Sequence, residues 1–346
     1  MYSFTITTNY GGIMAHALET GSNGEVAFAS LRQPAWHGLG TVFESELTTS
    51  QMLKIAHLDE WNVRLESVSD LVPDYNFVSD SFMVVRDNPF DEGIDVLATV
   101  GERYKVVQND ELFSFADNML DGGRWETAGS IKNGRVVFGS LALERETVLD
   151  PNGVADIVKS YLLVKTSHDG SSAVEAMVTP VRVVCQNTLN AALRGVKQSY
   201  KIRHTQTVSG KVAAAREALG LAHTYMDEFE KVAQSMIQTE ITKATFDSIL
   251  EAAYPRPEKD VKGAITKWAN KVDQINDIWT SDTTNMIATT AWGAYNAMTE
   301  RLDWFRTGRG ERGAENAMAA ASGFDPVTNT EKGRLLSIVR DLAGVK

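Results

Sequence analysis

Two histidine motifs and a lone cysteine are the parts of this chain that come closest to catalytic chemistry. Residues 36–41 (WHGLGT) join the imidazole of His37 to an aromatic ring and two glycines, and residues 167–172 (SHDGSS) surround His168 with hydroxyls and a carboxylate. A hydrolytic triad draws its members from separate elements and sets its nucleophile on a strained elbow, which neighbours in one turn do not provide. Cys185 falls on the apolar face of a predicted helix, where a thiol is buried and inert. We therefore interpret both motifs as turns and expect no enzyme.

An enzyme alternative stays open at this point. A hydrolase or transferase built around His37 and His168 requires both imidazoles within hydrogen-bond reach of one pocket. No metal or nucleotide motif supports it: the six histidines show no helical pairing, and one cysteine excludes a cysteine cage. The glycines lack the Lys-Ser/Thr of a phosphate loop. We expect no cofactor and no metal.

Charge is distributed unevenly along the chain. The net charge is −11, yet residues 181–220 carry seven basic side chains and one acidic side chain, and no acidic residue lies between Glu175 and Glu217. A basic segment inside an acidic protein is typical of an anion-binding surface, because attraction to phosphate acts over a short range in salt. The alternative is an ordinary solvated surface whose spatial neighbours are acidic.

Cations together with aromatic rings are the combination that proteins use to bind single-stranded nucleic acid. The cations follow the phosphates, and the rings stack on bases. The basic segment and two earlier strands provide both kinds of side chain. The candidate residues for nucleic-acid binding are Tyr104, Lys105, Arg135, Arg182, Arg194, Lys197, Tyr200, Lys201, Arg203 and Lys211.

The elements that would position these residues are mostly strands in the first half of the chain. Short apolar runs between residues 61 and 183 are bounded by turn signals at Asn133-Gly134 and at residues 150–153. Apolar spacing predicts one helix over residues 109–120. A second helix is predicted to begin at Thr179-Pro180, since threonine caps helices well and proline suits their first position.

Long helices follow in the second half. Apolar residues from Val208 to Met236 alternate steps of four and three, which predicts a seam that faces a partner helix. Similar spacing continues over residues 261–279 and 287–305, after a break at residues 255–257. We expect an α+β fold, with a mixed or antiparallel sheet and packed helices, followed by an α-helical arm or bundle. The expected divisions are a weakly ordered lead (1–24), an α+β core domain (25–207) and a helical C-terminal domain (208–346).

Several longer motifs carry a resemblance to a known family. The chain resembles domain of unknown function 932, a family of phages, plasmids and prophages, over most of its length after about residue 30. The resemblance implies an origin and assigns no activity, and its strand–helix arrangement looks like that of the ring-forming annealing proteins of phage recombination. The matching segments are residues 36–41, 104–109, 126–130, 167–172, 179–189, 202–205 and 291–297.

These observations favour a non-catalytic protein that binds single-stranded nucleic acid. The fullest form of this hypothesis is a homo-oligomer, including a ring-shaped one, that anneals strands. Single-stranded DNA is the expected partner. The alternative is a phage structural or interaction protein that assembles through its helical arm, with Trp268, Trp279 and Trp292 as contacts. No apolar run is long enough to span a membrane and no signal peptide is present, so we expect a soluble protein of the bacterial host cytoplasm.

Overall fold

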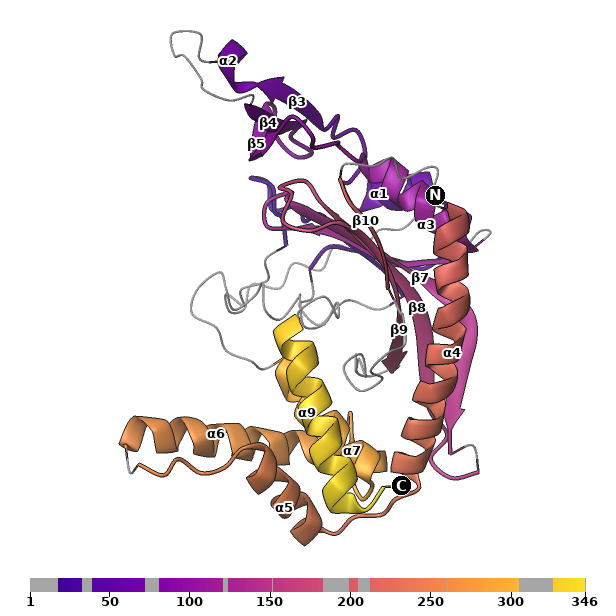
Figure 1. The fold of residues 1–346 in the computed structure, drawn as a ribbon, viewed down its shortest axis with the longest axis vertical. Helices are drawn as coiled ribbons and strands as arrows, with labels where there is room; N and C mark the ends of the chain where they lie inside the picture. The colour runs from indigo at the N-terminus through magenta and orange to yellow at the C-terminus, as the bar shows by residue number, and fades with distance from the viewer. Residues whose placement is uncertain are drawn as a thin grey trace. The chain divides into compact units, whose positions relative to one another are not determined.

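A computed structural model describes most of the chain (Figure 1). The described residues are 18–32, 39–71, 81–120, 124–150, 152–182, 199–204, 212–259, 261–304 and 326–345. The chain divides into two compact units. The first comprises Met1–Leu143, Tyr161–Val178 and Lys197–Gly220, and the second comprises Glu144–Ser160, Thr179–Val196 and Leu221–Lys346.

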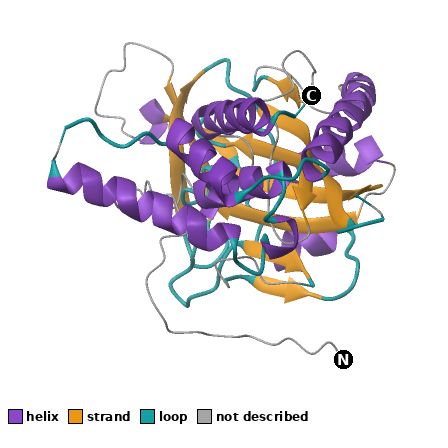
Figure 2. Cartoon of the chain, turned by 90° about the horizontal axis from the view of Figure 1, so that it is seen from below, coloured by secondary structure: helices purple, strands orange, loops and turns teal. Residues whose placement is uncertain are grey.

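A seven-stranded sheet is the main layer of the first unit, although residues 144–149 of β7, 156–160 of β8 and 179–182 of β9 belong to the second unit (Figures 1 and 2). The strand order is β10-β9-β8-β7-β6-β1-β2. β1 pairs with β2 in parallel, whereas β6 pairs antiparallel with both β1 and β7, and β9 pairs antiparallel with β10. The strands are β1 (Phe28–Leu31), β2 (Thr41–Phe43), β6 (Arg124–Ile131), β7 (Val136–Leu149), β8 (Asp156–Ser167), β9 (Val174–Arg182) and β10 (Ser199–Ile202).

A smaller antiparallel sheet in the order β3-β4-β5 and three helices complete the described part of the first unit. A reciprocal capping box of Thr48 and Gln51 begins the first of these helices, because each side chain satisfies a backbone N–H of the other residue. The elements are β3 (Arg64–Ser67), β4 (Ser81–Asp87), β5 (Ile94–Gly101), α1 (Thr49–Ile55), α2 (Val68–Leu71) and α3 (Asn109–Leu120).

The main core of the first unit forms between α1, α3 and one face of the large sheet. On α3, Leu112 and Phe113 are fully buried, and the ring of Phe113 stacks on that of Trp125 at 4.6 Å. Alternate residues of β8, Leu162 and Val164, point into the same core. The residues between them point to the other face of the sheet, and that face carries the charged groups described below.

Helices dominate the second unit. α7 packs against α6 and α9, and α5 packs against α9. Trp292 of α7 is buried and donates from its indole N–H to Asp156 at 2.9 Å, and Trp279 of α6 stacks on Phe246 at 4.0 Å. The helices are α4 (Val212–Ile237), whose first residues belong to the first unit, α5 (Lys243–Ala253), α6 (Lys262–Trp279), α7 (Ala291–Trp304) and α9 (Pro326–Ala343), with the short 3-10 turn η2 (Asn285–Ile287) before α7.

The expected α+β class with C-terminal helices is confirmed, as is the helix over residues 109–120. One expectation was wrong. Residues 179–182, predicted to begin a helix, end strand β9, because pairing within the sheet outweighs a local helix-start signal. Trp279 and Trp292, which the alternative of an interaction protein used as contacts, are buried within the second unit. Among the described helices, none is both long and apolar enough to cross a membrane.

Candidate functional site

Two lysines of the first unit share one carboxylate, and a third lysine lies near them. Glu175 of β9 lies opposite Lys201 of β10 in the antiparallel register, and their charged atoms are 2.8 Å apart. Lys165 of β8 approaches the other oxygen of the same carboxylate at 3.5 Å. Lys132, in the turn between β6 and β7, is close enough for its charge to act on Lys165. We call Lys132, Lys165, Lys201 and Glu175 the lysine cluster.

Burial sets the electrostatics of the lysine cluster. Only 13% of the Lys165 side chain is exposed, and this burial lowers its pKa, because the charged ammonium loses solvent. The charge of Glu175 raises the pKa of Lys165, whereas the charges of Lys201 and Lys132 lower it. The Lys201 side chain is 60% exposed. Two ammonium groups thus share the carboxylate of Glu175, and the exposed one, on Lys201, can attract an anion.

The strand alternation of β10 separates two groups of candidate residues. Tyr200 and Ile202 pack against the main core, and Tyr200 is partly buried there. Lys201 and Arg203 are exposed and alternate with them, so they belong to the opposite face. Arg203 follows the end of the strand. The structure therefore places the aromatic ring and the cations of this strand on different sides of the sheet.

Tyr104 is held inside the first unit and does not extend into solvent. Its ring stacks on that of His204 at 4.9 Å, and its hydroxyl donates to the carbonyl of Ser167 at 3.1 Å. Burial raises the pKa of Tyr104. His204 donates from Nδ1 to the carbonyl of Lys105 at 3.2 Å, and burial lowers its pKa. Lys105 is exposed. Tyr104, Lys105, Ser167 and His204, from three of the segments that carry the family resemblance, thus meet at one place.

The remaining candidates are described only in part. Arg135 is exposed and donates from Nε to the carbonyl of Leu97 at 3.1 Å. Arg182 is the last residue of β9. Outside the described residues lie Arg194, Lys197, Lys211, His37 and Cys185.

His168 lies in the interior and not in an open cleft. It is fully buried, its Nε2 lies 2.9 Å from Oδ1 of Asn109, and the Asn109 amide donates to the carbonyl of Leu58. The second bond orients the amide with its oxygen toward the imidazole, so Nε2 carries the proton. Burial is the main cause that lowers the pKa of His168 to about 3, and the charges of His204 and Arg86 act in the same direction. His168 is a neutral core residue.

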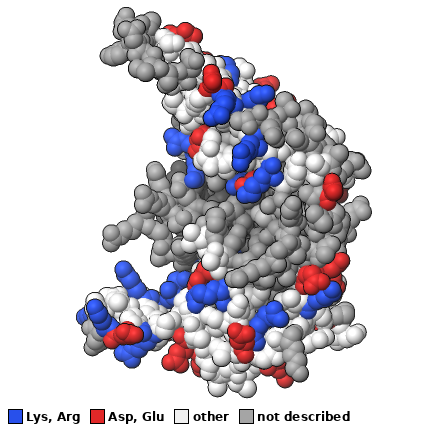
Figure 3. All heavy atoms as spheres, viewed as in Figure 1, with Lys and Arg blue, Asp and Glu red and all other residues white. Residues whose placement is uncertain are grey.

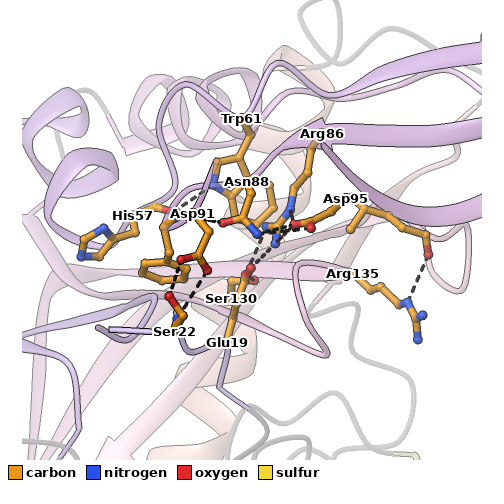
Figure 4. Close-up of polar contacts among 12 residues, drawn as sticks. Glu19, Ser22, His57, Trp61, Arg86, Asn88, Asp91, Asp95, Ser130 and Arg135 are labelled. Atoms are coloured by element: carbon orange, nitrogen blue, oxygen red, sulfur yellow. Dashed lines mark hydrogen bonds and ion pairs between the residues drawn. The ribbon is translucent and has the colours of Figure 1, made fainter. Parts of the chain in front are cut away.

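The sequence analysis did not identify a buried arginine that lies beside His168. Arg86 of β4 is 1% exposed, pairs with Glu19 and Asp95, and lies 3.9 Å over the ring of Trp61. Ser130 donates to the same Glu19 at 2.7 Å. These side chains point toward one another in Figure 4. Glu19 belongs to the expected lead segment, and no spacing pattern links it to Arg86.

A cavity of about 370 Å³ opens beside this arginine in the first unit. It lies between residues 19–21, strand β5 with the loop before it, and the turn between β6 and β7. Within the described ranges, no three His, Cys, Asp or Glu side chains could hold one metal ion. Side chains that line the cavity include Arg86, Asp91, Asp95, Val96, Asn133 and Arg135.

The turn at residues 132–135 adjoins both the cavity and the lysine cluster. Lys132, Asn133 and Gly134 all have positive φ, at 59°, 52° and 81°. A Cβ on Gly134 would lie 2.3 Å from a guanidinium nitrogen of Arg86, so only glycine allows the turn to pack there. Figure 3 shows basic side chains gathered in the upper part of the view, with acidic ones among them.

Comparison with known proteins identifies a family and no function. The family model described as "Domain of unknown function (DUF932)" matches residues 96–323, more than half of the chain. No curated protein and no solved structure matches the chain. The matched region includes strands β6–β10, all four residues of the lysine cluster, and helices α3–α7. The chain therefore belongs to the DUF932 family.

Proposed function

We propose that this chain is a non-catalytic protein that binds single-stranded nucleic acid through its phosphates. The observation that carries the proposal is the lysine cluster, in which Lys165 and Lys201 share the carboxylate of Glu175 and the charge of Lys132 acts on Lys165. Exposed Arg203 follows Lys201 along the chain and extends the positive charge. Such a surface attracts phosphates of any sequence, because the interaction is with the backbone of the strand.

The arrangement favours phosphate contacts over base stacking in this part of the protein. Tyr200 faces the main core, and one face of the Tyr104 ring is covered by His204. Neither ring is placed as a stacking platform of the kind that sequence-tolerant proteins use. A strand bound through its phosphates keeps the base edges free to pair along most of its length, and this is the requirement for annealing. We include annealing by a homo-oligomer, a phage or plasmid origin and a cytoplasmic location in the proposal.

Salt-titrated binding tests the proposal. Fluorescence anisotropy with a labelled single-stranded oligonucleotide should show affinity falling by roughly 0.7 log units per log unit of salt for each phosphate contacted. The double variant K132A/K201A should bind more weakly and show a shallower salt dependence. A matched control is K231A/K243A, which removes two exposed lysines that each pair with one carboxylate in the second unit.

The outcomes separate the proposal from its alternatives. Equal losses in the two double variants, or an unchanged salt dependence in K132A/K201A, would contradict the lysine cluster as the binding surface. Self-association that is insensitive to salt, without binding to the oligonucleotide, would favour a structural or interaction protein. Light scattering in the same buffers measures the association state, and a monomer at micromolar concentration would contradict the oligomeric part of the proposal.

A further inference from the structure

The cavity beside Arg86 adjoins the proposed phosphate-binding surface through one turn. Lys132 belongs to the lysine cluster, and Asn133 and Arg135 line the cavity. Gly134, between them, packs directly on the guanidinium of Arg86. A strand held by the lysines therefore passes within a few residues of the cavity, and the turn that links the two sites is fixed by the buried arginine.

The floor of the cavity is already assembled. Arg86 donates from Nε to Asp95 at 3.0 Å, from one terminal nitrogen to Glu19 at 3.1 Å, and from the other to both carboxylates. All three guanidinium nitrogens are thus engaged, and the cation–π contact with Trp61 holds the group in place. Arg86 is therefore not available to a ligand, and it keeps Asp95 in a fixed position at the cavity wall.

The remaining groups give the cavity two chemically different ends. Arg135 uses Nε on a backbone carbonyl, and no described carboxylate forms an ion pair with its two terminal nitrogens. A guanidinium edge of this kind matches two oxygens of a phosphate. At the other end, Asp91 accepts from Ser22 and Asp95 accepts from Arg86 and Asn88; both carboxylates repel a phosphate, and their remaining lone pairs can accept from an amine. The exposed amide of Asn133 can both donate and accept between the two ends.

We propose that this cavity holds one nucleotide of the bound strand, with its phosphate on Arg135 and an amine-bearing base directed toward Asp95 and Asp91. This inference rests on the proposed function and deepens it. The volume of about 370 Å³ is at the small end of the range for ligand pockets, which suits one nucleotide better than several. Carboxylates accept from the exocyclic amine of cytosine, and thymine has no such amine. The protein should therefore prefer cytosine or adenine over thymine at this position.

A matched pair of substitutions on β5 tests the cavity. Val96 lines it, whereas Ile94 does not, and the two residues are exposed to nearly the same extent, at 55% and 57%. We compare V96W, which fills the cavity, with I94W, which places the same ring two residues away. N133A is a third variant, at an exposed position; alanine is strained at the positive φ of 52° there, so urea unfolding first checks that this variant is folded. Anisotropy is measured with homopolymeric dC, dA and dT strands of equal length.

Wild-type protein should bind dC and dA about tenfold more tightly than dT. V96W and N133A should lose this preference while the steep salt dependence persists, and I94W should retain both. The inference is overturned if wild type binds all three strands equally, or if V96W and I94W behave alike. Salt-dependent binding without base preference would overturn the inference and leave the proposed function standing. Absence of binding to every strand would overturn both.

Discussion

The guanidinium of Arg86 lies 3.9 Å over the ring of Trp61 and pairs with Glu19, 67 residues earlier in the chain. Both partners of this ion pair are buried, with side-chain exposures of 1% and 7%. Removing charges from water is costly, and their attraction offsets that cost only when every donor has an acceptor. The contacts of Arg86 meet this condition, so the pair should be sensitive to the loss of either partner.

Replacing Arg86 with methionine should destabilise the protein by about 3–5 kcal/mol, because Glu19 would keep a buried charge without its partner. The double variant E19Q/R86M should recover part of that loss. Urea unfolding of the full chain measures both. A matched control is R64A, on the neighbouring strand, whose ion pairs with Glu66 and Asp87 are partly exposed and should matter much less. Equal losses for R86M and R64A would contradict this account of the buried pair.

Acid should destabilise the first unit through His168 and His204. Folding lowers the pKa of His168 from 6.5 to about 3, and it also lowers the pKa of His204. The unfolded chain therefore binds more protons than the folded chain between these values, so stability falls as pH decreases from 6.5 toward 3. Each additional proton bound by the unfolded chain lowers the free energy of unfolding by about 1.4 kcal/mol for each unit by which the pH falls. Unfolding midpoints across this range measure the slope.

The variant H168N isolates the contribution of His168. It should be less stable than wild type at neutral pH and should show a flatter dependence on pH, because one titrating group has been removed. An unchanged slope in H168N would contradict the assignment of His168 as a neutral core residue.

Glu175 should oppose nucleic-acid binding while it supports the fold. In E175Q, Lys165 and Lys201 lose their shared carboxylate, so more positive charge is available to phosphates. We expect tighter binding to single strands at low salt, together with a lower unfolding midpoint because partly buried Lys165 loses its partner. E228Q, which unpairs an exposed lysine on α4, should change neither property much. Weaker binding by folded E175Q would contradict the placement of phosphates at the lysine cluster.

The second unit depends on a buried tryptophan. Trp292 is 1% exposed, and its indole donates to the Asp156 carboxylate. W292F retains much of the apolar surface and removes the donor, so it should cost about 2 kcal/mol, within the range for hydrogen bonds to charged groups. W292A should cost more, since it also leaves a cavity. Thermal unfolding should rank wild type, W292F and W292A in that order, and a different order would show that the hydrogen bond or the packing has been misjudged.

Local patterns in the sequence account for the elements that formed as predicted. The helix over residues 109–120 and the helix over residues 262–279 follow from apolar spacing, and the turn at Asn133-Gly134 follows from its need for positive φ. These signals operate over a few neighbouring residues, so the sequence carries them without help from the rest of the fold. The α+β class and the family resemblance rest on the same kind of information.

Contacts between distant residues were decided by the tertiary structure alone. Glu19 meets Arg86, and Lys165 meets Glu175, only because the fold places separate segments of the chain together. The strand pairing of β10 decided that Tyr200 faces the core while Lys201 faces away, although both belong to one basic segment. A charge count along the chain has no information about faces. Sequence by itself thus determined most of the elements that form and where along the chain positive charge is concentrated. The pairing of strands decided which of those charges share a surface, because alternation in a sheet sends neighbouring residues to opposite sides.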